Sequence, residues 1–293
     1  MDPRPAAQRP TQQARQQATP AAASPEEPIA IVAMACRLPG GIRDPEGYWQ
    51  VLREGRDVVA PFPRERWDRE AIYDPDPDAP GKSYCQHGGF VADIDQFEPE
   101  FFGISLREAQ WMDPQQRLML ELAWEAMEDA GIPAQRLQGS RTGVFFGAMW
   151  SDYALLLHER GLPALAQHSA TGIHHSIIAN RVSYVLGLQG PSLVVHTACS
   201  SSLVALHLAC ESIHRGESVI AFAGGVNLNI LPDSTVSGVR FGGLSPDGRC
   251  YTFDARANGF SRGEGAGVVL LKPLAQALAD NDRIYCLIRG SAV

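Results

Sequence analysis

The chain has 293 residues, of which 45% are hydrophobic and 20% are charged. This composition is typical of a folded domain with a sizeable core, and it excludes a disulfide-stapled miniprotein and a wholly disordered chain. The formal net charge of −8 excludes the sequence-independent nucleic-acid binding that a basic surface provides.

The six cysteines are scattered without the paired spacing of a metal site or a redox motif. No apolar run approaches the roughly 20 residues that a membrane-spanning helix needs, and the N-terminus lacks the apolar core of a secretory signal. These features predict a cytoplasmic protein with reduced thiols and no membrane partner.

Residues 1–27 consist largely of Pro, Ala, Gln and Arg, with almost no large apolar side chains. Such a segment cannot bury enough surface to offset the entropy of ordering, so it predicts a disordered leader. Its arginines and scarcity of acids also resemble a transit peptide, but the repeated prolines disfavour the amphipathic helix that such a peptide forms.

The first regular elements carry clear boundary signals. The apolar run at 29–34 predicts a strand that is covered on both faces. Asp44-Pro45 supplies an N-cap and an N1 proline for a helix, and Ser105 to Glu108 has the spacing of a capping box. Asp113-Pro114 begins the clearest helix, which we expect to pack against the core and to end near Gly131.

The rest of the chain alternates between apolar strands and helices, which predicts βαβ units and a mainly parallel sheet. The expected strands are 142–147, 192–197, 219–225, 265–271 and 284–289, and the expected helices are 176–186, 200–214 and 274–279.

Cys199 lies between a predicted strand and a predicted helix, among residues small enough for a tight turn. A helix N-terminus favours a thiolate and an oxyanion by about 0.3 to 2 kcal/mol. A cysteine nucleophile normally has a further histidine or charge beside it, so we expect one here. We expect the other five cysteines to be small buried hydrophobes.

Six motifs occur in order along the chain. They are EPIAIVAMACRLPG (27–40), MDPQQRL (112–118), GPS (190–192), TACSSS (197–202), LSPDGR (244–249) and RGEG (262–265). From about Pro28 to Val293 the chain thus resembles β-ketoacyl synthases, particularly the ketosynthase domains of modular type I polyketide synthases.

The resemblance implies an α/β fold of thiolase type, layered α-β-α-β-α. It implies that residues 28–275 form a complete N-terminal half and that residues 276–293 begin a C-terminal half that is mostly missing. It also implies a homodimer and an acyl carrier protein as partner. The carrier's phosphopantetheine arm would deliver the substrate, and no cofactor would be tightly bound.

The same resemblance implies the chemistry of polyketide chain elongation. Cys199 would hold the acyl chain as a thioester, with its backbone N–H forming part of the oxyanion hole. Decarboxylative Claisen condensation with a malonyl-type extender would then lengthen the chain by two carbons.

Two residues depart from the family pattern. Ala33 stands where a glycine is usual, and His196 stands where an aspartate is usual, three residues before the cysteine. His196 could act as a substitute base. Three strand residues span roughly 10 Å and an odd spacing places side chains on opposite faces, so we favour a structural imidazole.

The family's two catalytic histidines and its lysine lie in His-Gly-Thr-Gly-Thr and Lys-x-Asn-x-Gly-His motifs, which are absent from these residues. We therefore expect the chain to be inactive alone, as a fragment of a ketosynthase. An alternative is a half-domain that acts by association with a complementary chain. A weaker one is a non-decarboxylating thiolase-like acyltransferase.

Two other patterns are weighed and set aside. His168, His174 and His175 lack a carboxylate or cysteine at ligand spacing, which disfavours a metal site. The run from Arg262 to Gly267 has no Lys-Ser/Thr after it and no strand immediately before it, so it does not fit a phosphate loop. We interpret its glycines as positions of tight backbone packing.

Overall fold

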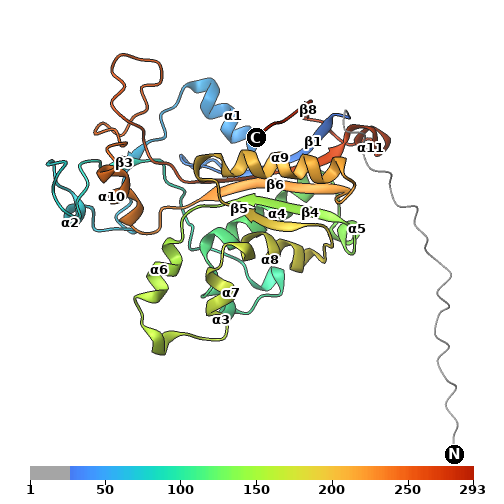
Figure 1. Ribbon diagram of the computed structural model, residues 1–293, viewed down its shortest axis with the longest axis horizontal. Helices are drawn as coiled ribbons and strands as arrows, with labels where there is room; N and C mark the ends of the chain where they lie inside the picture. Colours follow the sequence, from blue (N-terminus) through green and yellow to red (C-terminus); the bar gives the residue numbers. More distant parts are fainter. Residues whose placement is uncertain (1–26) are drawn as a thin grey trace, which may run out of the picture.

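The computed structural model describes residues 27–293, so nearly all of the predicted leader lies outside the described residues. A six-stranded sheet with the order β5-β4-β6-β7-β1-β8 forms the centre (Figure 1). Its strands are β1 (Ile29–Arg37), β4 (Thr142–Gly147), β5 (Ser192–Val195), β6 (Ile220–Asn227), β7 (Gly265–Pro273) and β8 (Cys286–Ile288). A separate two-stranded sheet joins β2 (Ala60–Pro61) to β3 (His87–Gly88).

The strand directions correct the prediction of a mainly parallel sheet. β4 runs parallel to β5 and to β6, whereas the β6–β7, β7–β1 and β1–β8 pairings are antiparallel. An antiparallel neighbour needs no crossover helix, and β7 follows β6 through a long connection that contains one short helix. A strand buried on both faces is apolar throughout in either direction, so the sequence pattern could not distinguish the two cases.

The structure confirms five helices predicted from the sequence. These are α1 (Pro45–Glu54), α4 (Pro114–Asp129), α8 (Ser176–Leu186), α9 (Ser201–His214) and α11 (Leu274–Ala279). The other α-helices are α2 (Arg69–Ile72), α3 (Leu106–Ala109), α5 (Ala134–Leu137), α6 (Asp152–His158), α7 (Ser169–Ile173) and α10 (Asp233–Arg240). Of these, only α3 had a signal in the sequence, the capping residues before it.

The sheet carries a hydrophobic core on each face. Val144, Phe146 and Phe222 point toward α4 and α8. Phe145 and Ala223 point to the opposite face, where α9 packs. This alternation follows the two-residue period of a strand. Figure 1 shows the sheet lying between α9 on one side and α4 with α8 on the other.

The predicted helix starts are formed as expected, with one difference. Asp44 accepts a hydrogen bond from the backbone of Gly47 at 2.6 Å, and Ser105 accepts one from Glu108 at 3.1 Å. In a full capping box the Glu108 side chain would accept a hydrogen bond from the Ser105 backbone. Here the Glu108 carboxylate instead accepts from Arg181 at 2.7 Å. The side chain thus ties α3 to α8.

Within residues 27–293 no helix combines the length and the apolarity needed to cross a bilayer. A third, smaller hydrophobic cluster of Phe62, Trp67, Cys85, Val239 and Leu244 joins the segment around β2 and β3 to α10. The Phe62 and Trp67 rings meet edge to face at 5.0 Å. This cluster supports the long loop between β6 and β7.

The N-cap of α4 supplies a stability prediction. Asp113 is buried, and burial raises its pKa to about 6 despite hydrogen bonds from Gln115. Folding therefore favours the protonated carboxyl. Its contribution to the free energy of unfolding is fully present below about pH 4 and is lost as the pH rises through about 6. Asp113→Asn keeps the capping oxygen without the charge. It should gain up to about 3 kcal/mol of unfolding free energy over the parent between pH 4 and pH 7.

Urea unfolding at several pH values measures this difference. Asp44→Asn is the matched control, because Asp44 caps α1 with an exposed carboxylate, and it should show no comparable gain. A pH-independent effect of Asp113→Asn would contradict the assignment.

Candidate active site

Cys199 lies where the chain turns from β5 into α9. It occupies a short 3-10 turn, Ala198–Ser200, and its side chain is exposed. The carboxyl ends of the parallel strands β4, β5 and β6 meet at this edge of the sheet, which is where ligands bind in open α/β sheets. The predicted strand–turn–helix elbow is therefore present.

Two serine hydroxyls hold the turn in shape. Ser201 Oγ donates to the Ala198 carbonyl at 2.6 Å and accepts from the Thr197 N–H at 2.9 Å. Ser200 Oγ donates to the Thr197 carbonyl at 2.8 Å. Ala198 has a φ of 54°, a left-handed conformation that costs a residue other than glycine about 1–3 kcal/mol. The hydroxyl bonds offset this cost and fix the residue before Cys199.

Two glycines let the start of α9 lie unusually close to the sheet. A Cβ at Gly147, the last residue of β4, would lie 2.6 Å from the Ser201 carbonyl carbon and the Ser202 nitrogen. A Cβ at Gly225 in β6 would lie 2.8 Å from the Ser202 Cβ. Side chains at these positions would push the elbow away from the strand ends.

Cys199 opens into a cleft of about 480 Å³. Its walls come from the end of β4, the elbow, the end of β6 and the loop before β7. The lining residues are Gly147, Ala148, Met149, Trp150, Ala198, Cys199, Ser201, Ser202, Gly225, Val226, Asn227, Phe260, Ser261, Arg262, Gly263, Glu264 and Gly265. This volume is within the usual range for small-molecule sites.

Arg262 and Trp150 form one wall of the cleft. The guanidinium lies 5.4 Å from the centre of the indole ring. It donates to the Ser234 carbonyl at 2.9 Å and to the Asn229 side chain. Burial lowers the pKa of Arg262, and the charges of Asp152 and Glu264 oppose that change. Sequence reasoning missed this wall because its two residues are far apart in the chain.

Glu264 is the residue of the RGEG motif (262–265) that has a clear structural role. Its side chain is fully buried and pairs with Arg66 at 2.8 Å, and it accepts from the backbones of Val91 and Asn229 at 2.8 Å each. Burial raises its pKa, while the Arg66 guanidinium opposes the rise. The Glu264 carboxylate therefore holds three loops together.

The glycine interpretation of this motif holds only in part. A Cβ at Gly265 would lie 3.0 Å from Leu38. A Cβ at Gly267 would make only an ordinary contact, 3.8 Å from the Ala35 carbonyl oxygen, and Gly263 faces open space. Tight packing around an added Cβ therefore explains one of these three glycines.

His196 is exposed, and it is not among the residues that line the cleft. Its Nδ1 lies 3.5 Å from the Ala198 nitrogen, and its ring centre is 6.4 Å from that of His175. His175 Nε2 in turn lies 3.1 Å from the Trp150 carbonyl oxygen. These contacts fit a structural imidazole, which remains our prediction for His196.

The other cysteines are less uniform than expected. Cys85 and Cys210 are buried and Cys36 is half-buried, with burial raising the pKa of Cys36 and of Cys210 to about 11. Cys250 and Cys286 are exposed, so the expectation of a buried hydrophobe is wrong for these two. Among the described residues no group of three or more His, Cys, Asp or Glu could hold a metal ion.

Together these features define an α/β protein with a cysteine on a strand–turn–helix elbow that opens into a cleft. The chain matches the family described as Beta-ketoacyl synthase, N-terminal domain, over residues 26–277. It belongs to this family.

Curated relatives and solved structures agree with this assignment. The chain is 50% identical to one of the phenolphthiocerol/phthiocerol polyketide synthase proteins of Mycobacterium tuberculosis, covering 91% of this chain and 14% of the relative. It is 52% identical to polyketide synthase GfsA of Streptomyces halstedii, covering 92% and 4% respectively. The chain thus spans a small part of these relatives.

Among solved structures, the oxazolomycin ketosynthase domain OzmH KS7 of Streptomyces albus JA3453 matches with a TM-score of 0.83 and 43% identity. That match covers 89% of this chain and 45% of that chain. The ketosynthase from module 6 of the bacillaene synthase of Bacillus subtilis 168 matches with a TM-score of 0.80 and 41% identity, covering 89% of this chain and 43% of that one. The thiolase-like fold of polyketide ketosynthases is therefore confirmed.

The glycine contact at the elbow supplies a second prediction. Gly147→Ala places a methyl group against the backbone of α9, and such overpacking costs about 1–3 kcal/mol. The variant should lose unfolding free energy of that size. It should also change the rate at which a thiol reagent modifies Cys199, followed by mass spectrometry of the peptide.

Gly290→Ala is the control, because a Cβ there would meet nothing within 4 Å. Equal stability and equal Cys199 modification in both variants would show that the close approach does not position the elbow.

Proposed function

We propose that the chain carries the acyl-accepting part of a polyketide ketosynthase, with Cys199 as the nucleophile. The single observation that carries this proposal is the exposed Cys199, held on a rigid elbow at the mouth of a cleft. Membership of the family supplies the reaction class. The proposed substrates are acyl thioesters on the phosphopantetheine arm of an acyl carrier protein.

The first step transfers the acyl chain. The Cys199 thiol gives up its proton, and the thiolate attacks the thioester carbonyl to form a new C–S bond. The bond to the arm's sulfur breaks, and the released arm takes up a proton to become a thiol. The Cys199 backbone N–H is proposed to donate to the oxyanion, which concentrates charge where a preorganised donor stabilises it most. The small side chains around the thiol leave room for the incoming carbonyl.

The second step forms the carbon–carbon bond. A malonyl-type extender loses CO₂, its carbanion attacks the Cys199 thioester, and the thiolate leaves. This step needs hydrogen-bond donors for the developing enolate. The family's histidine motifs are absent from these 293 residues, so we propose that condensation needs them from outside this sequence and that the chain alone does not condense.

The remaining expectations are proposals of the same kind. β5 is an edge strand whose outer side has no neighbour among the described residues, which supports pairing of two copies as a homodimer. The partner is an acyl carrier protein, and the setting is the cytoplasm. The domain boundary between residues 275 and 276 stays a prediction, and β8 pairs with β1 in the same sheet.

Acylation tests the nucleophile directly. A chain that includes the family's histidine motifs, incubated with an acyl N-acetylcysteamine thioester, should gain the mass of one acyl group on the peptide that contains Cys199. Cys199→Ala should abolish this gain because no thiol remains at the elbow. Cys250→Ala, which removes another exposed thiol, should leave it unchanged. Acylation that persists in Cys199→Ala would overturn the assignment.

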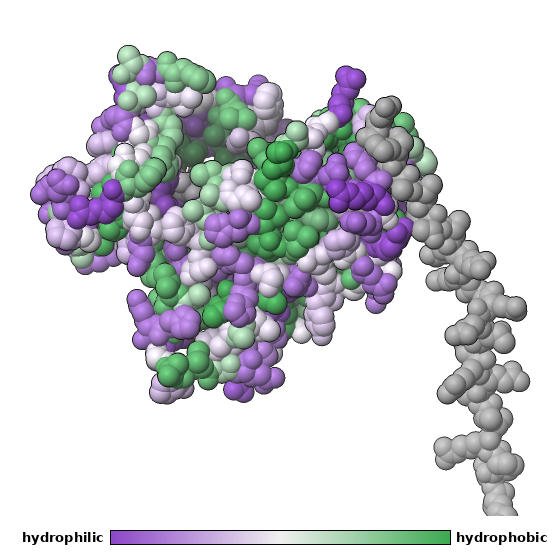
Figure 2. Space-filling view, viewed as in Figure 1, coloured by the Kyte–Doolittle hydropathy of each residue, from purple (hydrophilic) through white to green (hydrophobic). Residues whose placement is uncertain are grey.

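A second candidate is a half-domain that works by association with a complementary chain. The outer side of α9 favours it, since Leu203 is 70% exposed and Leu287 of nearby β8 is also exposed. Figure 2 shows hydrophobic surface in the middle of the face where Figure 1 places α9. Exposed apolar patches of this kind mark interaction sites.

Native mass spectrometry separates this candidate from an independent chain. The protein is measured alone and then mixed with a chain that carries the family's second half. A complex should form only in the mixture. Leu203→Glu should weaken the complex, whereas Leu162→Glu, at an exposed leucine on another element, should not. A stable monomer that ignores the second chain would contradict association.

A further inference from the structure

A second cavity lies apart from Cys199. It has a volume of about 670 Å³ and shares no lining residue with the Cys199 cleft. Its walls are the end of β1 and the loop that follows, the segment 91–102, and the outer side of α4. Nothing in the proposed acyl transfer uses it.

The cavity is acidic. Five carboxylates line it against two arginines. Arg37 forms a two-pronged ion pair with Glu125, and Arg43 pairs with Asp93 at 3.1 Å. These two pairs occupy both arginines. Glu98, Glu121 and Glu128 are the carboxylates that remain without a cationic partner within the part of the chain that the structure describes.

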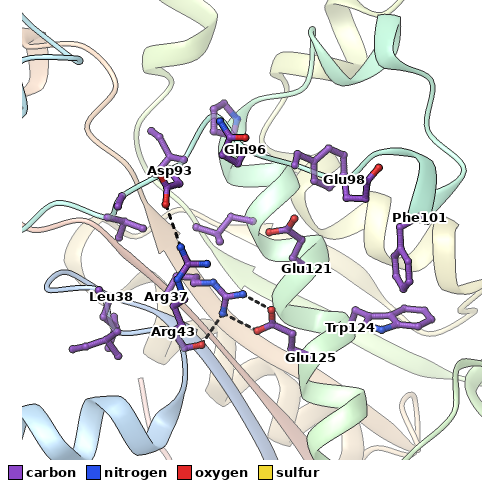
Figure 3. Close-up of a pocket in the computed structure, with 18 of the residues that line it drawn as sticks. Arg37, Leu38, Arg43, Asp93, Gln96, Glu98, Phe101, Glu121, Trp124 and Glu125 are labelled. Carbon is purple, nitrogen blue, oxygen red and sulfur yellow. Dashed lines mark hydrogen bonds and ion pairs between the residues drawn. The ribbon is translucent and has the colours of Figure 1, made fainter.

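Glu121 is the most informative of the three. It lies on α4 one helical turn before Glu125, and in Figure 3 it projects between the arginine pairs and the rings of Phe101 and Trp124. Its side chain makes no hydrogen bond to another described residue. Burial raises its pKa to about 6; the charges of Arg37, Arg117 and Arg43 oppose the rise, and that of Glu125 adds to it. A half-buried carboxylate without a partner costs free energy, which an incoming cation would recover.

Aromatic rings form the opposite side of the cavity. Phe97 and Phe102 stack at 5.6 Å. Phe101 meets Phe102 and Trp124 edge to face, each at 4.9 Å, and is 57% exposed. Trp124 is fixed by its Nε1, which donates to Glu128 at 2.9 Å. Such rings bind a cation by its charge and an apolar side chain by its surface.

The charge, size and aromatic lining of the cavity limit the class of ligand that could bind in it. Its excess negative charge disfavours an anion. Among the described residues no group of three or more His, Cys, Asp or Glu could hold a metal ion, which favours an organic cation. The cavity is larger than one ammonium or guanidinium group needs, and its aromatic side needs an apolar partner. A free amine would leave that side uncovered, whereas a peptide presents both groups on one backbone.

We propose that this cavity docks a segment of a partner protein that presents an arginine or lysine next to an aromatic side chain. The basic group lies against Glu121 with Glu98 and Glu128 nearby, and the aromatic group packs against Phe101 and Trp124. The site is independent of Cys199, so its failure and the failure of acyl transfer are separable.

The probe is acetyl-Arg-Phe-amide, titrated into the intact chain by isothermal calorimetry at low salt. The matched probe is acetyl-citrulline-Phe-amide, which keeps the shape and removes the charge. We expect the arginine probe to bind at least fivefold more tightly, with the difference shrinking as salt is added. Acetyl-Arg-Gly-amide tests the aromatic half and should also bind more weakly.

Variants assign the binding to the cavity. Glu121→Gln should abolish the preference for arginine over citrulline, and Trp124→Leu should remove the preference for Phe over Gly. Glu159→Gln, at an exposed glutamate outside the cavity, should change neither preference. Circular dichroism and the thermal midpoint confirm that each variant is folded, and acylation at Cys199 should be unaffected.

Three results would overturn the proposal. One is equal affinity for the arginine and citrulline probes. Another is an arginine preference that survives Glu121→Gln in a folded protein. The third is spermidine binding as tightly as acetyl-Arg-Phe-amide and unaffected by Trp124→Leu, which would make the cavity a site for free amines.

Discussion

The close approach of α9 to the sheet is the constraint on which the position of Cys199 depends. Gly147 and Gly225 leave space for the first turn of the helix. Ala205 and Ala209, one and two turns further on, are fully buried against the same face. Small residues on the strands and on the helix allow close contact from the start of α9 to Ala209, and tightly packed interiors do not yield to small displacements. The elbow is therefore held rigidly, and the strained turn at its start is tolerated.

The cleft in front of the elbow depends on a second constraint, the buried Glu264. A buried ion pair is weak evidence for stability, because desolvation offsets most of the attraction. Its value here is geometric: one carboxylate receives bonds from Arg66, Val91 and Asn229. Asn229 also receives a bond from Arg262 in the cleft wall. The wall is thus positioned by a polar network that reaches the sheet through β7.

Sequence alone could predict the elements whose ends are marked by local signals such as capping residues. Asp44 and Asp113 cap their helices as expected because a cap is a local interaction between near neighbours. The elbow at Cys199 was predictable for the same reason, from a strand, small residues and a helix in sequence. Strand direction was not predictable, because the apolar runs of β1 and β7 satisfy both arrangements equally.

The cleft wall and the acidic cavity show a different limit. The Trp150–Arg262 contact joins residues whose distance in space depends on the fold as a whole. Glu264 was visible only as part of a glycine motif, since nothing near it in sequence shows that a glutamate will be buried beside Arg66. Polar side chains in a core are specified by partners from other elements, and single-sequence patterns do not contain those pairings.

Helix α4 illustrates how both kinds of information meet in one element. Its inner side, with Met119, Leu122 and Met127, packs against the core as the sequence predicts. Its outer side places Glu121 and Glu125 one turn apart, and such like-charge pairs cost a helix about 0.2–0.5 kcal/mol. Arg37 from β1 neutralises Glu125 and leaves Glu121 facing aromatic rings. A solvated helix face would gain nothing from this arrangement. A cation bound at this surface would offset both the repulsion between the two glutamates and the free energy cost of desolvating the Glu121 carboxylate.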